Sequence, residues 1–593
     1  MVLKRLVQCR KVGKRVGAVG IVFVGIVNLI ACTRTNDQTA LVTMSKKDTC
    51  PYEEFLVVDV FDNFANYQGI QSGWFGELVK NKFNMELNII APNVTGGGDT
   101  LFEMRSAAGS VGDLLIVKAD NGVLEDLVNA GLVYNMEEDL QGKGIMKHWE
   151  AIENLNSSIQ QDGVFAIPSE VSMHSPEISS EGTEPAYGPY IRWDLYKELG
   201  YPKLETFEDL LPVLKQMQEL NPTAADGTKT YGFSFFKEWD NNMMNAVKQP
   251  CCMYGYDEFG VVLAKADGSD YQSIIDDNSI YVRMLQFYFM ANQMGLVDPE
   301  SADQNYDQCF EKYEKGQVLF SPWPWLGPSA YNTRVNTEAG KGMLFVPIKD
   351  MKIYSYGCYP YGNQGCVIAV GSQVKDPKRL VDFIDWLYSS EGIMANGAYL
   401  LGGTAGLEGL TWEMKEGEPY LTEFGKEALL NGGNIQVPPE YGNGTWTSGT
   451  SVLNFKPVAQ CEENEEGIHY YYNMWDSVKE IEQPTIIQDW KTWMKADTTM
   501  EYLQNNDMLL VGQGISYIAP LEGTEQFTIR SQCKKAIQEY SWEMIFAQDY
   551  EQFESLLREM QTTVKSYGYD AILEYDMRHA KMRDNEKDKN DTK

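Results

Sequence analysis

The feature of this sequence that most constrains its fold is a regular alternation of strand and helix patterns early in the chain. Residues 55–61 (FLVVDVF) form a short apolar run rich in β-branched side chains, which is typical of a strand buried on both faces. Helical and strand patterns then alternate at residues 74–83, 85–90, 100–108, 113–118 and 123–131. Such an alternation predicts an α/β lobe with a mainly parallel sheet and helices on its faces.

Further helices are predicted along the rest of the chain. Thr206 and Asp209 form a capping-box pattern, although Pro212 predicts a kink or a later start of that helix. Asp376 followed by Pro377 predicts another helix start. The last third is helical, and residues 533–567 have the spacing of a docked amphipathic pair. Beyond it, the charged residues 577–593 have little to bury and are expected to be disordered.

The first residues have the layout of an export signal. Six basic residues between Lys4 and Arg15 precede an apolar run at residues 16–30, and the run ends in the sequence LIAC. Small residues before a cysteine at that place resemble a lipobox, so Cys32 is expected to be lipidated and to become the mature N-terminus. The alternative, an uncleaved membrane anchor, fits less well because the run is shorter than the roughly 20 apolar residues of a spanning helix.

These patterns divide the chain into parts of different character. The expected parts are a signal peptide at 1–31, a lipid-anchored tether at 32–52, a folded part at 53–576 and a charged tail at 577–593. The folded part is long enough for two to four domains. The formal net charge of the chain is −34, and loss of the basic signal residues makes it more negative still. A nucleic-acid partner is therefore disfavoured, because such binding needs a basic surface.

Cysteines and histidines form no recognisable metal or catalytic motif. Besides Cys9 and Cys32, eight cysteines remain without Cys-x-x-Cys spacing, and we expect most of them to be buried free thiols. The four histidines form no HExxH motif and accompany no GxSxG motif, which disfavours a zinc hydrolase and a nucleophilic triad. The glycines at 96–98 lack the lysine of a phosphate-binding loop. No cofactor, metal ligand or catalytic residue is predicted.

Aromatic side chains provide the leading candidates for ligand binding. The chain contains 13 Trp and 34 Tyr, and aromatic rings suit sugars because the C–H face of a pyranose stacks on them. The strongest local pattern is SPWPW at residues 321–325, where two prolines stiffen a loop directly after an apolar strand. Ligands bind at such strand ends in open α/β sheets. Trp323 and Trp325 are therefore the first candidates.

Weaker candidates lie in four other regions of the sequence. For any single tryptophan among them, packing in the core is the competing interpretation. The loop after the first strand offers amide and aromatic side chains, and the other positions neighbour polar or glycine-rich sequence. These candidates are Asn63, Asn66, Tyr67, Trp74, Trp239, Tyr361 and Trp446.

Three stretches resemble extracellular solute-binding protein family 1, in particular its LipO-like lipoprotein branch. They are residues 84–113 (NMELNIIAPNVTGGGDTLFEMRSAAGSVGD), 187–202 (YGPYIRWDLYKELGYP) and 294–327 (MGLVDPESADQNYDQCFEKYEKGQVLFSPWPWLG). The resemblance implies an α/β, two-lobed periplasmic-binding-protein-like fold of type II, with additional C-terminal helices at about 470–576. It also implies that the lobes close about a hinge and that the closed, liganded form docks on a permease.

The combined patterns predict a non-catalytic, monomeric substrate-binding lipoprotein of a bacterial ABC importer. It is expected at the extracellular face of the cell membrane, where it captures a carbohydrate, in particular an oligosaccharide, for the permease subunits. Two alternatives stay open. The 84 acidic residues always allow a pair of carboxylates suited to glycoside hydrolysis, so a secreted carbohydrate-active enzyme is one of them. The other is a peptide-binding importer component.

Overall fold

The computed structural model describes residues 50–590, except residues 96–97, 120–121, 158, 160, 399–402, 516 and 518–521. The predicted signal peptide, Cys32 and the tether up to residue 49 lie outside the described residues. Among the helices that are described, none has the length and apolar character that crossing a membrane requires.

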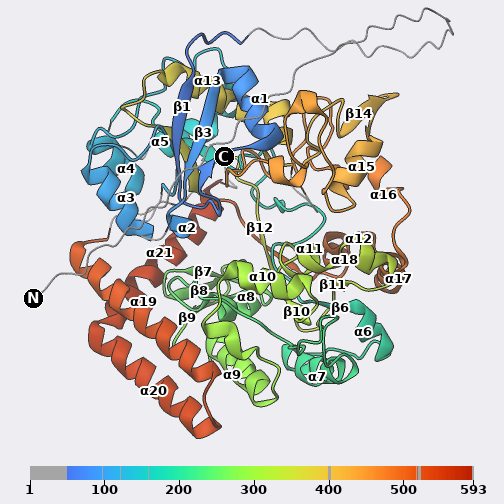
Figure 1. Ribbon diagram of the computed structural model, residues 1–593. Coiled ribbons are helices and arrows are strands. Elements are labelled where there is room, and N and C mark those ends of the chain that lie inside the picture. The colour runs from blue at the N-terminus through green and yellow to red at the C-terminus, as the bar shows by residue number, and fades with distance from the viewer. Residues whose placement is uncertain are drawn as a thin grey trace, which may run out of the picture. The chain divides into compact units, whose positions relative to one another are not determined.

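A mixed sheet with the strand order β2-β3-β1-β4-β13-β5 forms the centre of the first lobe (Figure 1). β1 pairs in parallel with β3 and β4, whereas β13 pairs antiparallel with β4 and β5. β1, β3, β4 and β5 therefore run in one direction, as the alternation predicts, and β2 and β13 run against them. The strands are β1 Leu56–Asp62, β2 Gly69–Ile70, β3 Met85–Ile90, β4 Leu114–Val117, β5 Ile167–Ser169 and β13 Asn363–Val370.

Alternation along the strands gives this sheet two apolar faces. In β1, Val58 and Val60 belong to the core that includes α1 and α13, whereas Phe61 belongs to the core that includes α4. The helices start where the sequence predicts them, and the side chain of Asp376 caps α13 by accepting the N–H of Arg379. The helices of this region are α1 Gly73–Phe83, α2 Pro92–Thr95, α3 Gly98–Ala107, α4 Val123–Asn129, α5 Trp149–Asn156, α13 Pro377–Leu387 and α14 Ser390–Asn396.

A smaller subregion, residues 404–480, extends the core on the α1 side of the sheet. Its apolar residues, among them Trp412 and Trp475, belong to the same buried cluster as Trp74 of α1. In Figure 1 its hairpin and short helices lie beside α1. Its elements are β14 Trp412–Lys415, β15 Glu418–Leu421, α15 Glu423–Leu429 and α16 Asp476–Lys479.

The second lobe has one large core built around two small antiparallel sheets. These sheets have the strand orders β10-β6-β11 and β7-β8-β9. The strands are β6 Tyr190–Arg192, β7 Tyr256–Phe259, β8 Val262–Lys265, β9 Tyr271–Ser273, β10 Phe320–Ser321 and β11 Met343–Phe345. The helices before the C-terminal group are α6 Trp193–Glu198, α7 Leu210–Leu220, α8 Asn245–Cys252, α9 Ile280–Gln293, α10 Tyr306–Glu314, α11 Gly327–Tyr331, α12 Arg334–Glu338, α17 Thr485–Met494 and α18 Thr499–Asn505.

Within the described residues, the chain passes between the two lobes at three places, so the lobes are interleaved. The first passage leads from β5 to β6, and the second leads from β12 (Ile353–Tyr356) to β13. The third leads from Val478, in the core of the first lobe, to Ile486, in the core of the second. β12 pairs in parallel with β16 (Leu509–Gly512) on the side of the second lobe.

Three helices end the described chain: α19 (Thr524–Ile545), α20 (Tyr550–Tyr567) and α21 (Tyr569–Asn590). α19 and α20 pack side by side (Figure 1), which confirms the predicted amphipathic pair. The prediction of a disordered tail from residue 577 is wrong for the described residues. The helix continues because His579 and Ala580 are buried, and because the hydroxyl of Tyr271 donates a hydrogen bond to Asp584.

The eight described cysteines are free thiols in this structure, as predicted. Most of them are buried, namely Cys251, Cys252, Cys309, Cys358 and Cys533. Cys358 and Cys461 nevertheless have their Sγ atoms only 3.4 Å apart, although 103 positions separate them in the chain. No sequence spacing could indicate this proximity.

Candidate ligand-binding site

One edge of the first-lobe sheet gathers four of the predicted site residues. β1 ends at Asp62 and is followed by the loop that carries Asn63, Asn66 and Tyr67. β13 runs in the opposite direction, so its beginning, next to Tyr361, lies at the same edge as the ends of β1 and β4. This edge corresponds to the carboxyl ends of parallel strands, where α/β sheets bind ligands.

Asp62 fixes the shape of the loop at this edge. Its fully buried carboxylate accepts hydrogen bonds from the backbone N–H of Phe64, at 3.0 Å, and of Asn454, at 2.9 Å. The Asn454 side chain in turn donates to the carbonyl of Phe64. Burial raises the pKa of Asp62 to about 6, and the hydrogen bonds from the backbone oppose this rise.

Trp74 and Trp446 are core residues and offer no ring to a ligand. Their rings stack at a centroid distance of 4.4 Å and an interplanar angle of 10°, and their exposed fractions are 1% and 0%. Gly73, at φ +71°, lies so close to Gly449 that a Cβ on Gly73 would be 2.2 Å from the Cα of Gly449. The glycines of the 440–449 segment therefore serve close packing on α1 instead of binding, which corrects the prediction for both tryptophans.

The SPWPW loop lies at the end of β10, as predicted, and beside the first passage between the lobes. Ser321 of β10 pairs with Tyr190, the first residue of β6. The carbonyl of Pro322 accepts the N–H of Gly188, which belongs to the segment that arrives from the first lobe. The loop is thus held at the side of the second lobe where the connecting segment enters.

The two rings of this loop have different environments. Trp325 is 41% exposed, whereas Trp323 is 7% exposed and donates its indole N–H to Gln249. The rings stack at 4.7 Å between centroids with 28° between their planes. Trp325 therefore presents a free face to solvent, and Trp323 supports it from below.

Other aromatic rings extend this pair into an aromatic platform, formed by Trp239, Tyr306, Trp323 and Trp325. Trp239 lies 5.6 Å from Trp325 and stacks on Tyr306 at 5.0 Å with 24° between the planes. The structure thus brings Trp239 together with the two leading candidates. Tyr306 was missed by the sequence analysis, because it comes from α10 and its sequence surroundings, NYDQ, indicate only a helix start.

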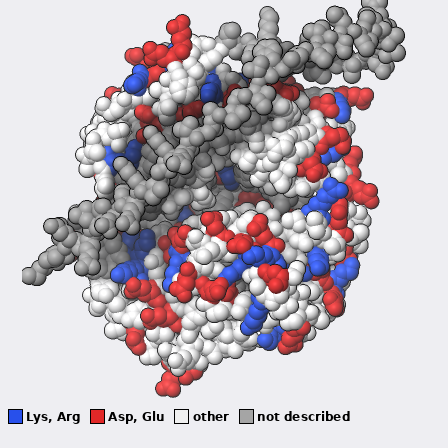
Figure 2. Space-filling view, in the orientation of Figure 1, with Lys and Arg blue, Asp and Glu red and all other residues white. Residues whose placement is uncertain are grey.

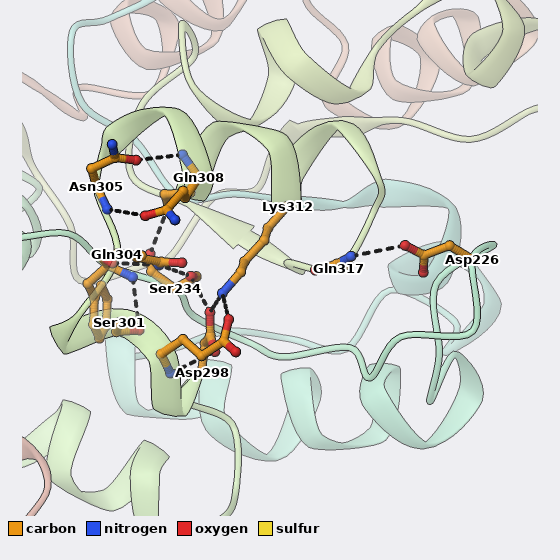
Figure 3. A network of polar contacts seen from close by, with 12 residues as sticks. Asp226, Ser234, Asp298, Ser301, Gln304, Asn305, Gln308, Lys312 and Gln317 are labelled. Carbon is orange, nitrogen blue, oxygen red and sulfur yellow. Dashed lines mark hydrogen bonds and ion pairs between the residues drawn. The ribbon is translucent and has the colours of Figure 1, made fainter. Parts of the chain in front are cut away.

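A polar network holds α10 and the segment at 233–236 in place (Figure 3). Asp298 accepts hydrogen bonds from Ser234, at 2.7 Å, and from the ammonium of Lys312, at 2.7 Å. Gln304 donates to Ser234, and the carboxamide and backbone groups of Asn305 and Gln308 form the capping box of α10. A buried network of this kind rigidifies its surroundings, so Tyr306 is presented from a fixed helix.

Two acidic residues, Glu238 and Asp240, adjoin Trp239 of the platform in the sequence. The backbone N–H of Tyr306 donates to the carboxylate of Glu238 at 2.6 Å, and the indole of Trp542 donates to Asp240 at 2.7 Å. Desolvation raises the pKa of Asp240 to about 6. Acidic side chains are also spread over the visible face of the molecule (Figure 2), in keeping with the net charge of −34.

Two cavities lie near the two parts of the site. The first, of about 20 Å³, lies beside Trp323 and has room for one water-sized group. The second, of about 120 Å³, is lined by Asn396, Asn454 and Lys456 among others, beside the loop that follows β1. The exposed face of Trp325, and not an enclosed cavity, is therefore the main candidate contact surface.

No protein-family model matches this sequence, and the search of curated proteins found no relative. Solved structures do match. FusA of S. pneumoniae, an ABC-transporter substrate-binding protein in complex with kestose, has a TM-score of 0.56 and 12% identity, covering 89% of this chain and 99% of that chain. The alginate-binding protein AlgQ2 without calcium ion has a TM-score of 0.55 and 12% identity, covering 90% and 100%.

The fold is that of a two-domain periplasmic solute-binding protein. A further match is the N-glycan transport solute-binding protein NgtS of Streptococcus pneumoniae in complex with Man1GlcNAc, with a TM-score of 0.50 and 14% identity, covering 89% and 100%. The predicted α/β, two-lobed fold is therefore confirmed. Identities this low show the fold alone, so the ligand has to be argued from the site.

Proposed function

We propose that this chain is the substrate-binding component of a bacterial ABC importer and that it captures an oligosaccharide without transforming it. The observation that carries the proposal is the exposed face of Trp325, stacked on Trp323 and flanked by Trp239 and Tyr306. A preformed stack of this kind suits the apolar C–H face of a sugar ring. The proteins that share the fold support it, since their names describe binding of kestose, alginate and an N-glycan fragment.

The charges near the platform favour a neutral sugar. Glu238 and Asp240 flank Trp239 in the sequence, whereas the adjacent Lys237 lies over the ring of Trp542. A uronic acid on Trp325 would bring a carboxylate close to these acidic groups, which costs energy at neutral pH. We therefore expect neutral fructan or mannan oligosaccharides to bind better than alginate oligosaccharides.

The protein is expected to be anchored to the membrane and to act with permease subunits. The lipobox-like sequence before Cys32 supports a lipid anchor at the extracellular face of the membrane, with the permease subunits of the importer as partners. The fold supports a monomer whose lobes close on the ligand. No local motif in the sequence supports glycoside hydrolysis, so we propose no catalytic residue.

Substitution of Trp325 tests the site. Trp325→Ala should weaken oligosaccharide binding by about 1 to 3 kcal/mol, or about 5- to 150-fold in Kd, because it removes the exposed stacking face. Isothermal titration with the sugar that gives the largest thermal shift in a screen of neutral and acidic oligosaccharides measures this change. Trp323→Ala should also lower the melting temperature, since Trp323 is buried.

Trp493→Ala is the matched control. Trp493 is 39% exposed, lies in the same lobe and packs on Trp193. Unchanged affinity in Trp325→Ala, with wild-type behaviour of the control, would rule out the platform as the sugar site. Chromatography of the incubated sugars separates the alternatives, since a shortened oligosaccharide would identify an enzyme. Stabilisation by peptide mixtures alone would identify a peptide-binding component.

A further inference from the structure

Segments from the first two passages between the lobes lie side by side with a segment of the first lobe. Val171 forms isolated bridges with Tyr359 and with Val458, and Ser179 forms one with Gly357. We call these three segments strips. The first strip, which contains Val171 and Ser179, belongs to the connection from β5 to β6, and the second, which contains Gly357 and Tyr359, belongs to the connection from β12 to β13. The third, around residues 458–462, precedes the last passage to α17. Any bond among these three strips would act where the lobes are joined.

Three metal-ligating side chains meet at this point, and a fourth adjoins one of them. A ring nitrogen of His174, the Sγ atom of Cys461 and a carboxylate oxygen of Glu462 all lie within 4.8 Å of one another, in a group that does not include Cys358. The Sγ atom of Cys358 lies 3.4 Å from that of Cys461. Cys358 comes from the second strip, His174 from the first, and Cys461 and Glu462 from the third.

The backbone and neighbouring groups hold these side chains in place. The N–H of Cys358 donates to the carbonyl of Ile178 at 2.9 Å, and the N–H of Cys461 donates to Ser180 at 3.3 Å. The Glu462 carboxylate accepts the N–H of Met173 at 3.0 Å and the hydroxyl of Ser172. Outer contacts of this kind orient ligands in metal sites.

The Glu462 carboxylate offers negative charge to a bound cation. Its side chain is 7% exposed, and 3.9 Å separates Nε2 of His174 from its Oε1. A mostly buried carboxylate favours a cation beside it, and a divalent ion would neutralise it.

We propose that His174, Cys461 and Glu462 form a site for a thiophilic divalent cation of the zinc type, and that Cys358, beside Cys461, becomes the fourth ligand when the ion binds. Two sulfurs, one imidazole and one carboxylate are a ligand set that zinc binds tetrahedrally. Two thiolates on such an ion, each at about 2.3 Å, lie about 3.8 Å apart, close to the separation of the two sulfurs here. Binding releases the protons of both thiols. The ion cross-links the three strips at the junction of the lobes. This role does not depend on which ligand the protein captures.

Cobalt is the spectroscopic probe for this site. Titration of the reduced full chain with Co²⁺ should give the charge-transfer band of a cobalt–thiolate bond and the visible bands of tetrahedral cobalt, saturating at one ion per chain. Zn²⁺ should displace the cobalt and raise the melting temperature. Competition with a chromophoric chelator gives the affinity for zinc.

The variants separate the ligands from bystanders. Cys358→Ser and Cys461→Ser should each abolish or halve the charge-transfer band. The His174 side chain is 41% exposed, so its replacement should leave the fold intact. His174→Gln should weaken zinc binding at least tenfold. Cys533→Ser, which removes a buried thiol on α19, is the control and should keep the wild-type cobalt spectrum.

Two results would overturn the proposal. One is a wild-type chain that shows no cobalt–thiolate band after full reduction, with mass spectrometry of the untreated chain revealing a Cys358–Cys461 disulfide, since the pair would then be a redox cross-link. The other is a cobalt spectrum that persists unchanged in Cys461→Ser and in His174→Gln, since the ion would then sit elsewhere. Neither result depends on the identity of the captured sugar.

Discussion

Trp74, Trp446 and Trp325 look alike in the sequence, since each has a glycine or proline within two residues. Their surroundings in space separate them. Trp74 and Trp446 stack against each other in the core, with the N–H of Trp74 donating to the carbonyl of Trp446 at 3.0 Å. Trp325 stacks on one side only and is 41% exposed. At the scale of single residues, an exposed ring therefore separates the candidate Trp325 from the two core tryptophans.

Asp62 should make the stability of the protein depend on pH. Burial raises its pKa to about 6, whereas the unfolded chain has an Asp pKa of about 3.9. The folded state therefore holds a proton that the unfolded state releases between about pH 4 and pH 6, so stability falls as the pH rises through this window. Asp62→Asn should remove about 3 kcal/mol of this pH-dependent loss in the free energy of unfolding.

Urea unfolding of wild type and Asp62→Asn at several pH values between 4.5 and 7.5 measures the effect. The stability of the wild type relative to the variant should decrease as the pH rises. Glu53→Gln, which changes an exposed carboxylate just before β1, should leave the pH dependence of the wild type in place. A difference between Asp62→Asn and wild type that stays constant with pH would contradict the assignment.

At the scale of elements, α21 shows how a charged helix is held by few contacts. Asp576 is 3% exposed and accepts the N–H of Val261 at 2.7 Å, and it forms an ion pair with Arg530 of α19 at 2.7 Å. Gly260 permits this approach, because a Cβ there would lie 2.0 Å from the Asp576 carboxylate. Asp576 of α21 thus bonds to both the β7–β8 turn and α19.

Asp576→Ala should destabilise the protein by about 3 to 5 kcal/mol, because it leaves Arg530 with one carboxylate fewer in a largely buried position. Denaturant unfolding measures the loss. Asp570→Ala on the same helix removes an exposed carboxylate and should cost less than about 1 kcal/mol. Equal losses in the two variants would mean that the buried contacts of Asp576 add nothing specific to the stability of the protein.

At the scale of the whole molecule, the buried apolar side chains of the described residues form one cluster in the second lobe and two on the faces of the first-lobe sheet. Few segments pass between these cores. The lobes can therefore lose stability separately, and a substitution deep in one core should be felt mainly in that lobe.

Trp446→Ala should test this independence. It removes a fully buried ring from the first lobe and should destabilise that lobe by about 3 to 5 kcal/mol. Hydrogen exchange followed by mass spectrometry should show lower protection in β1, β3 and β4 and unchanged protection in α9 and α19. A loss of equal size in all of these elements would show that the molecule unfolds as one cooperative body.

Much of the fold could be predicted from local patterns. Periodicity located β1, α1 and β3 because each buries its apolar residues at the spacing of its own secondary structure. Of the candidate site, the loop at residues 321–325 was found because its two prolines and two tryptophans are adjacent in sequence. Tyr306 was not found, because only the packing of α10 brings it to the platform.

Local patterns were enough to predict the α/β class, many helix starts and the supply of aromatic rings suited to a sugar, since these depend on neighbours within a few residues. Tertiary packing was needed to show which tryptophans face solvent, that β13 joins a sheet whose first strand lies about 300 residues earlier, and that Cys358 meets Cys461. The physical reason is that burial and side-chain contact arise from residues far apart along the chain, which no local spacing records.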